Sequence, residues 1–158
     1  MTTTLQHELV YDARMGEVTA MLADPGFREK VADAQGALRR RVTIGGAPRE
    51  VQIDRVQSTV GVPSFAKPII TGDLAVRHNE VWSTDTVAVV DITIPGGLAT
   101  LRGNISLSES DGRTTESVRL SIKVPVPMVG AKLEQYVEEL MLKAFDLEQA
   151  VGAAYLSR

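Results

Sequence analysis

An imidazole and a carboxylate that are two residues apart are the side chains in this sequence best suited to chemistry. His78 and Glu80 lie in the segment Asp73–Trp82, which alternates as a β-strand does. On one strand, both would face the same side of the sheet, about 7 Å apart. Such a pair can serve in general acid–base catalysis. Many proteins that are not enzymes share this spacing, so it predicts no particular reaction.

Two arginines extend this cluster. In the segments Leu38–Ile44 and Glu50–Gln57, alternation places Arg40 and Arg55 on the more apolar face of each strand. Four polar groups would then face the interior from three strands that follow one another in sequence. A buried charge without a partner is costly, so two interpretations remain open. The charges are either solvated or paired near the strand ends, or they contact a ligand, and a bulge would reverse the parity.

The later strands predict an apolar wall opposite these charges. Val87–Ile94, Leu98–Ser108 and Thr114–Val124 alternate so that each has an entirely apolar inner face. A lone tryptophan such as Trp82 usually belongs to the core, but at a strand end it can also wall a pocket. An apolar pocket with a few convergent polar groups is typical of small-molecule sites. The expected ligand contacts are Arg40, Arg55, Val76, His78, Glu80, Trp82, Val90, Ile92, Leu101, Val137 and Met141.

The elements that must position these residues follow from hydrophobic periodicity. Leu5–Tyr11 alternates as a first strand, and two short helices separated by Asp24-Pro25-Gly26 follow it. From Val129 to Leu156, apolar residues recur every three or four positions, which predicts one long helix. We therefore expect a single α+β domain over residues 1–158. It would have a curved antiparallel sheet of about seven strands, and the long helix would cover the concave face.

Composition excludes several classes of function. The chain has 158 residues, with 17 basic and 20 acidic side chains, so it lacks the positive charge typical of nucleic-acid binding. It contains no cysteine, which excludes thiolate catalysis and cysteine metal sites. No phosphate-binding loop, metalloprotease motif or nucleophile elbow is present, so we expect neither a cofactor nor a metal. Without a signal peptide or a membrane-length apolar run, we expect a cytoplasmic protein.

Two short sequence segments carry a resemblance to a known superfamily. The first segment runs from Tyr11-Asp12-Ala13 to the helix break at Asp24-Pro25-Gly26-Phe27. Together with the element order, it resembles the START-like (SRPBCC) superfamily. The stretch from Val124 to Glu134 resembles a small actinobacterial family of unknown function within that group. This resemblance implies a helix-grip fold with a ligand cavity between the helix and the sheet. Members bind lipids, sterols, polyketides or hormones, and some are enzymes, so no functional residue carries over.

Three functions remain open at this point. The first is binding or carriage of a hydrophobic or amphipathic small molecule, lipid-like or polyketide-like, without catalysis. The second is a cyclase or dehydratase that uses His78 and Glu80 as acid–base groups, which requires both to converge on a cavity. The third is an interaction protein whose core is filled, because an interior with only 4% aromatic residues can be packed with Val, Leu and Ile.

Overall fold

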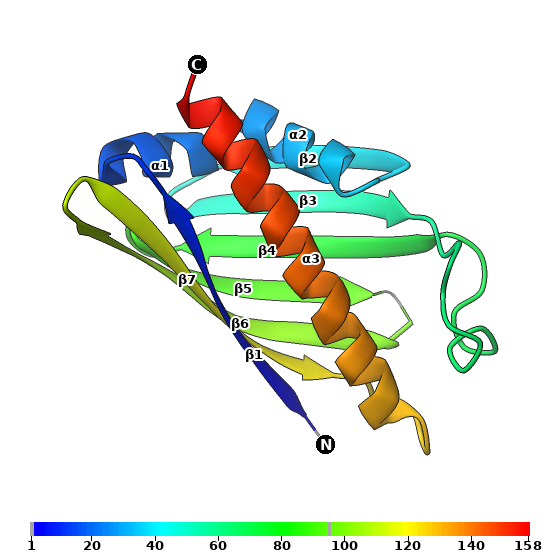
Figure 1. The fold of residues 1–158 in the computed structure, drawn as a ribbon. Coiled ribbons are helices and arrows are strands. Elements are labelled where there is room, and N and C mark those ends of the chain that lie inside the picture. Colours follow the sequence, from blue (N-terminus) through cyan, green and yellow to red (C-terminus); the bar gives the residue numbers. More distant parts are fainter. Residues whose placement is uncertain (1, 95) are drawn as a thin grey trace.

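A computed structural model describes residues 2–94 and 96–158 of the chain. In these residues it shows one antiparallel sheet of seven strands, in the order β1-β7-β6-β5-β4-β3-β2, and three helices (Figure 1). The elements in chain order are β1 (Thr3–Tyr11), α1 (Met15–Leu22), α2 (Pro25–Ala34), β2 (Arg39–Gly45), β3 (Arg49–Gln57), β4 (Leu74–Trp82), β5 (Val87–Ile94), β6 (Ala99–Ser110), β7 (Arg113–Lys123) and α3 (Gly130–Leu156).

The helices all lie on the concave side of the curved sheet. Figure 1 shows α3 running diagonally across that face, with α1 and α2 on either side of its C-terminal end. The sequence therefore predicted the α+β fold class and the element order correctly, and most element boundaries agree within one or two residues. No helix in the described part of the chain is both long and apolar enough to cross a membrane.

The inner face of β7 departs from its expected apolar character. Val118, Leu120 and Ile122 are buried, as strand alternation predicts. However, Thr114 and Glu116 share their parity and are also buried, with 0% and 3% of their surface exposed. The Thr114 hydroxyl is satisfied because it donates a hydrogen bond to the carbonyl of Ala13 at 2.8 Å. The expectation of a fully apolar inner face was therefore wrong for this strand.

A glycine allows α3 to pack closely on β1. A Cβ atom at Gly152 would overlap Cε1 of Tyr11 and would lie 3.2 Å from two further atoms of that ring. Tyr11 is 1% exposed, so its ring has little room to move. We expect Gly152→Ala to lower the free energy of unfolding by about 1–3 kcal/mol through overpacking, although alanine favours helix.

Urea unfolding of two matched variants tests this packing. Gly16 lies in α1, and a Cβ there would meet no atom within 4 Å. Gly16→Ala should therefore raise the free energy of unfolding, by no more than about 0.5–1 kcal/mol because Gly16 is in the first turn of the helix. If Gly152→Ala were stabilising to the same extent, the tight contact between α3 and β1 would be contradicted.

Candidate ligand-binding site

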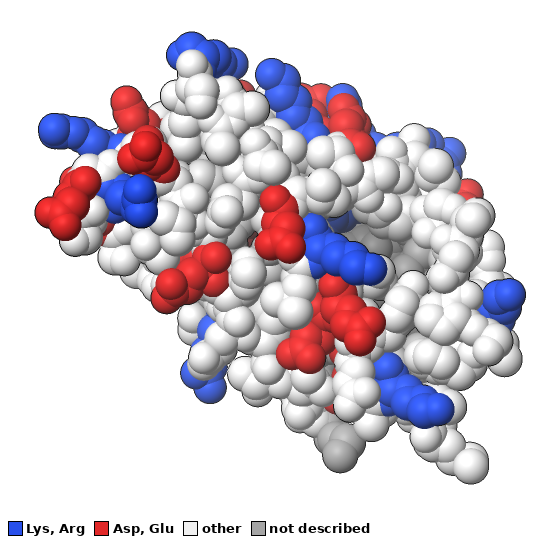
Figure 2. Space-filling view, in the orientation of Figure 1, with Lys and Arg blue, Asp and Glu red and all other residues white. Residues whose placement is uncertain are grey.

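An apolar cavity of about 340 Å³ lies between α3 and the sheet. Its walls come from β3 to β6, the residue that follows β7 and the N-terminal half of α3, and the segment 57–62 forms part of its rim. Figure 2 shows that acidic and basic side chains are interleaved over α3, whereas the surface towards the 58–73 segment carries few charges. The cavity is lined, among others, by Val76, Ile92, Ile94, Leu101, Leu133, Tyr136, Val137 and Met141.

The cavity exists because the core is divided into two clusters. The larger cluster lies under α1, α2 and the C-terminal half of α3, and it contains Phe27 and Phe145. The smaller cluster packs the irregular segment 62–70 against Ala99, Val124 and Leu133 near the start of α3. Cavity-lining residues come from both clusters, so the cavity occupies the space between them.

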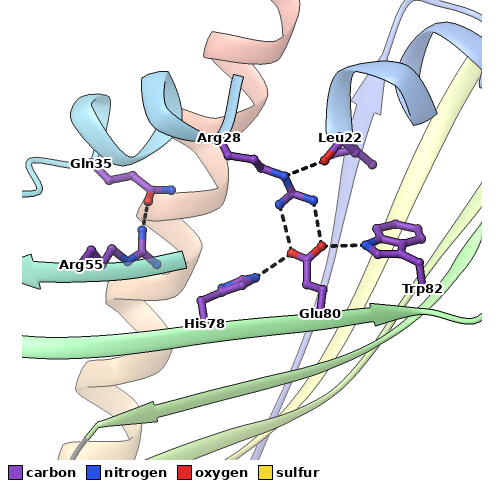
Figure 3. A network of polar contacts seen from close by, with 7 residues as sticks. All are labelled: Leu22, Arg28, Gln35, Arg55, His78, Glu80 and Trp82. Carbon is purple, nitrogen blue, oxygen red and sulfur yellow. Dashed lines mark hydrogen bonds and ion pairs between the residues drawn. The ribbon is translucent and has the colours of Figure 1, made fainter. Parts of the chain in front are cut away.

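A buried ion pair lies at the α2 end of the sheet. Arg28 of α2 donates to both carboxylate oxygens of Glu80 on β4, at 3.0 Å from Nη1 and 2.7 Å from Nη2 (Figure 3). Its Nε donates to the carbonyl of Leu22 at 2.9 Å. The two side chains are only 5% and 1% exposed. This two-point geometry is the strongest form of an arginine–carboxylate contact, and it ties α2 to the centre of the sheet.

Glu80 is also bound by two neighbours on its own strand. Nε2 of His78 lies 2.6 Å from Oε2, and Nε1 of Trp82 donates to Oε1 at 2.9 Å. Each carboxylate oxygen therefore has two partners. Burial alone would raise the pKa of Glu80, but Arg28 and the hydrogen bond from His78 outweigh it and hold the pKa well below its usual range. Glu80 is thus a fixed anion.

A small chamber of about 30 Å³, which we call the polar chamber after its charged lining residues, lies beside this network, and apolar side chains such as Ile53 and Phe145 form the rest of its wall. Arg28, Gln35, Arg55, His78 and Glu148 contribute its polar lining. Two of these residues, Gln35 and Arg55, also line the apolar cavity, so the chamber borders its inner end. A space of this size holds about one water molecule, or one small polar group of a ligand.

Arg55 is held in place at this border by a neutral partner. Its Nη1 donates to Oε1 of Gln35 (Figure 3). Nε2 of Gln35 in turn donates to the carbonyl of Ala144 in α3 at 3.0 Å. Nε of Arg55 is buried and has no partner among the described residues. Burial lowers the pKa of Arg55, and the nearby Glu148 opposes that shift. The guanidinium is therefore a cation that is ordered but not neutralised by direct contact.

Two further carboxyl groups approach the network from β7 and α3. Glu116 is 3% exposed, and its Oε1 has no hydrogen-bond partner among the described residues. Burial raises the pKa of Glu116, and Glu148 raises it further because two neighbouring carboxylates would repel each other. Burial also raises the pKa of Glu148, although Arg28 opposes this shift. The Tyr11 hydroxyl nearby stays neutral, since burial raises its pKa as well.

The structure brings together most of the residues that the sequence predicted for the site. Six of them line the apolar cavity, namely Arg55, Val76, Ile92, Leu101, Val137 and Met141. His78 lines the polar chamber, as do Arg55 and Met141. Glu80, Trp82 and Val90 are buried in the adjoining core, at 1%, 3% and 2% exposure, and do not border the cavity.

Arg40 was expected to contact the ligand, but the structure places it outside the site. It is on β2, one of the two edge strands, where α2 covers the sheet. Its guanidinium forms ion pairs with Glu29 at 2.7 Å and Asp33 at 3.2 Å, and its side chain remains 34% exposed. The strand parity was right, but a helix rather than the cavity lies over this part of the sheet. Arg40 is therefore a paired surface charge, which is the other interpretation that the sequence left open.

Four polar residues of this region were not predicted from the sequence. Arg28 and Gln35 come from α2 and its C-terminal cap, and Glu116 and Glu148 come from β7 and α3. Two signals were present. Arg28 precedes the buried Val31 by three residues and so shares its helix face, and Glu116 has the parity of Val118. Nothing comparable marks Gln35, whose role depends on the approach of α3.

Comparison with protein families identifies the chain. The model of the family described as "Protein of unknown function (DUF2505)" matches residues 6–156. The chain belongs to this family. No curated protein matches the chain. This match agrees with the expected membership of a family of unknown function. That the family is confined to actinobacteria stays a prediction.

Solved structures share the fold of the DUF2505 chain. The protein TTHA0849 from Thermus thermophilus is 16% identical, with a TM-score of 0.67, over 96% of this chain and 99% of that one. The Zhui aromatase/cyclase from Streptomyces sp. R1128 is 13% identical, with a TM-score of 0.64, over 100% and 97%. Norcoclaurine synthase from Thalictrum flavum is 14% identical, with a TM-score of 0.55, over 94% and 92%. Together they confirm the helix-grip fold implied by the sequence resemblance.

Proposed function

We propose that this protein binds a hydrophobic or amphipathic small molecule, lipid-like or polyketide-like, in the apolar cavity under α3. The observation that carries the proposal is the space of about 340 Å³ between the two buried core clusters. Its volume lies within the range of about 300–1,000 Å³ that is typical of small-molecule pockets. An interior left open in this way loses packing energy unless a ligand fills it.

The two alternative functions are less well supported. An interaction protein with a filled core does not need this cavity. A cyclase or dehydratase that uses Glu80 as a proton donor or acceptor is disfavoured, because four donors already engage its carboxylate and its pKa is lowered. His78 alone retains a position on the polar chamber from which it would act as a base.

Binding of the neutral fluorescent dye Nile red tests the proposal. We expect saturable binding with a blue-shifted emission, because the dye would move from water into an apolar cavity. The double variant Val76→Phe/Val137→Phe should weaken binding at least tenfold, since both side chains face the cavity. Its unfolding should remain cooperative, as measured by circular dichroism.

Val89→Phe is the matched control for the added aromatic bulk. Val89 lies on the outer face of β5 and is 61% exposed, so a ring there leaves the cavity unchanged. Binding by this variant should equal that of the wild type. The proposal is wrong if the wild type does not bind the dye, or if the cavity-filled variant, while still folded, binds it with wild-type affinity.

A further inference from the structure

Among the residues that the structure describes, the polar end of the site contains one cation that no carboxylate contacts. Arg28 is neutralised by its two-point contact with Glu80. Arg55 lies close to the same network, yet no carboxylate of the described residues lies within the 4.0 Å of an ion pair. Its protein partner is the neutral amide of Gln35. A partly buried cation that contacts only an amide retains most of its attraction for an anion.

The position of Arg55 suits a ligand group better than a solvent contact. Its side chain borders both the apolar cavity and the polar chamber. Gln35 orients the guanidinium through its own bond to the carbonyl of Ala144, so the side chain is held between β3 and α3. Its buried Nε lacks an acceptor among the described residues. A planar guanidinium held in this way is well suited to a carboxylate or another oxygen acceptor.

We propose that the ligand is amphipathic, with an apolar body in the cavity and an anionic head, most simply a carboxylate, that Arg55 binds at the border of the polar chamber. This inference rests on the proposed function, because it names the chemical class of molecule that the cavity takes. It assigns Arg55 to binding and specificity, with Gln35 as the residue that positions it.

The acidic groups around Arg55 determine how this binding depends on pH. Glu148 lines the chamber, Glu80 is engaged by Arg28 and His78, and Glu116 is close enough to interact with Glu148 and Glu80. Burial raises the pKa of Glu148, and Glu80 adds to that shift while Arg28, His78 and Arg55 oppose it. A protonated Glu148 does not repel an anionic head, whereas an ionised one does. Affinity for a carboxylate should therefore fall as the pH rises through the pKa of Glu148.

Displacement of bound Nile red by decanoate or by 1-decanol tests the head-group assignment. The two compounds have the same chain length and differ only in the head group. At pH 7 we expect decanoate to displace the dye from the wild type at a concentration at least tenfold lower than 1-decanol. Arg55→Met should abolish this preference while the affinity for 1-decanol stays within twofold. Arg55→Lys, which keeps the charge, should restore part of it. Arg102→Met removes an arginine that is 68% exposed on the outer face and should leave the preference unchanged.

The outcomes distinguish this inference from the function on which it rests. Equal binding of decanoate and 1-decanol by the wild type would overturn the anionic head and leave hydrophobic binding intact. A preference that survives in Arg55→Met would overturn the role of Arg55. Failure of the dye and both decyl compounds to bind would overturn the proposed function and the inference together.

Glu148→Gln tests the pH dependence separately. Between pH 6 and 9 decanoate stays ionised, so a fall in its affinity reports on the protein. We expect this fall to be reduced in Glu148→Gln, with the affinity for 1-decanol unaffected by pH. A fall of the same size in the variant would overturn the part assigned to Glu148.

Discussion

Replacement of Glu80 by glutamine should lower the free energy of unfolding by about 3–5 kcal/mol, the usual cost of removing one partner from a buried ion pair. Arg28 would remain charged and 5% exposed, with no carboxylate in contact. Glutamine would also turn an amide N–H₂ towards donors that now point at an oxygen, namely the guanidinium, His78 and the indole of Trp82. Chemical unfolding in urea at neutral pH measures the effect.

An exposed ion pair provides the matched control. Asp91 on β5 pairs with Arg102 at 3.3 Å, and their side chains are 45% and 68% exposed. Asp91→Asn should therefore cost no more than about 1 kcal/mol. The double variant Arg28→Met/Glu80→Gln should recover part of the lost stability, since it removes the isolated charge. If Glu80→Gln and Asp91→Asn cost the same, then Arg28 is not confined in the way that the structure shows.

Replacement of Glu116 by glutamine should change how stability depends on pH. Burial and Glu148 raise the pKa of Glu116, so over the range between its unfolded and folded pKa values the folded state binds more protons than the unfolded state. Stability contributed by such a group is present below the unfolded pKa of about 4.3 and is lost as the pH rises towards the folded pKa. Glu80 acts with the opposite sign, because its lowered pKa makes stability fall as the pH decreases.

Glutamine at position 116 is neutral at every pH, so the decline above pH 5 should become smaller. At pH 8 we expect Glu116→Gln to be more stable than the wild type by on the order of 1–3 kcal/mol, comparable with the cost of an unsatisfied buried polar group. Urea unfolding at pH 5, 6.5 and 8 measures this difference. Glu139→Gln, at an exposed position on α3, is the control and should follow the wild type. Parallel curves for Glu116→Gln and the wild type would contradict the prediction.

The secondary structure followed closely from local pattern. Alternation marked β4 and β7, and the three-to-four-residue period marked α3 to within about one residue at its start. Local pattern suffices here because one face of each element must be buried, and the period of that face depends only on whether the backbone is a strand or a helix. The same parity placed Arg55, His78 and Glu80 on the helix-facing side of the sheet.

Parity could not predict which of those inward-facing groups are paired. Arg40 and Arg55 are directly opposite each other on β2 and β3, and both face the helices. One lies under α2 and pairs with its acidic surface, whereas the other lies beside the cavity. The difference arises from the position of α2 over the edge of the sheet. Likewise, the partner of Glu80 is Arg28, 52 residues away on a helix whose orientation no strand pattern specifies.

For this protein, then, the sequence by itself determined the elements, their order and the face that each one buries, because these depend on local periodicity. Only the tertiary structure decided that an open cavity remains under α3 and that a charged network lies at its inner end. The curvature of the sheet and the packing of the 62–70 segment separate the two core clusters. Both depend on contacts between residues far apart in the chain, and the space between those contacts leaves no pattern in the sequence.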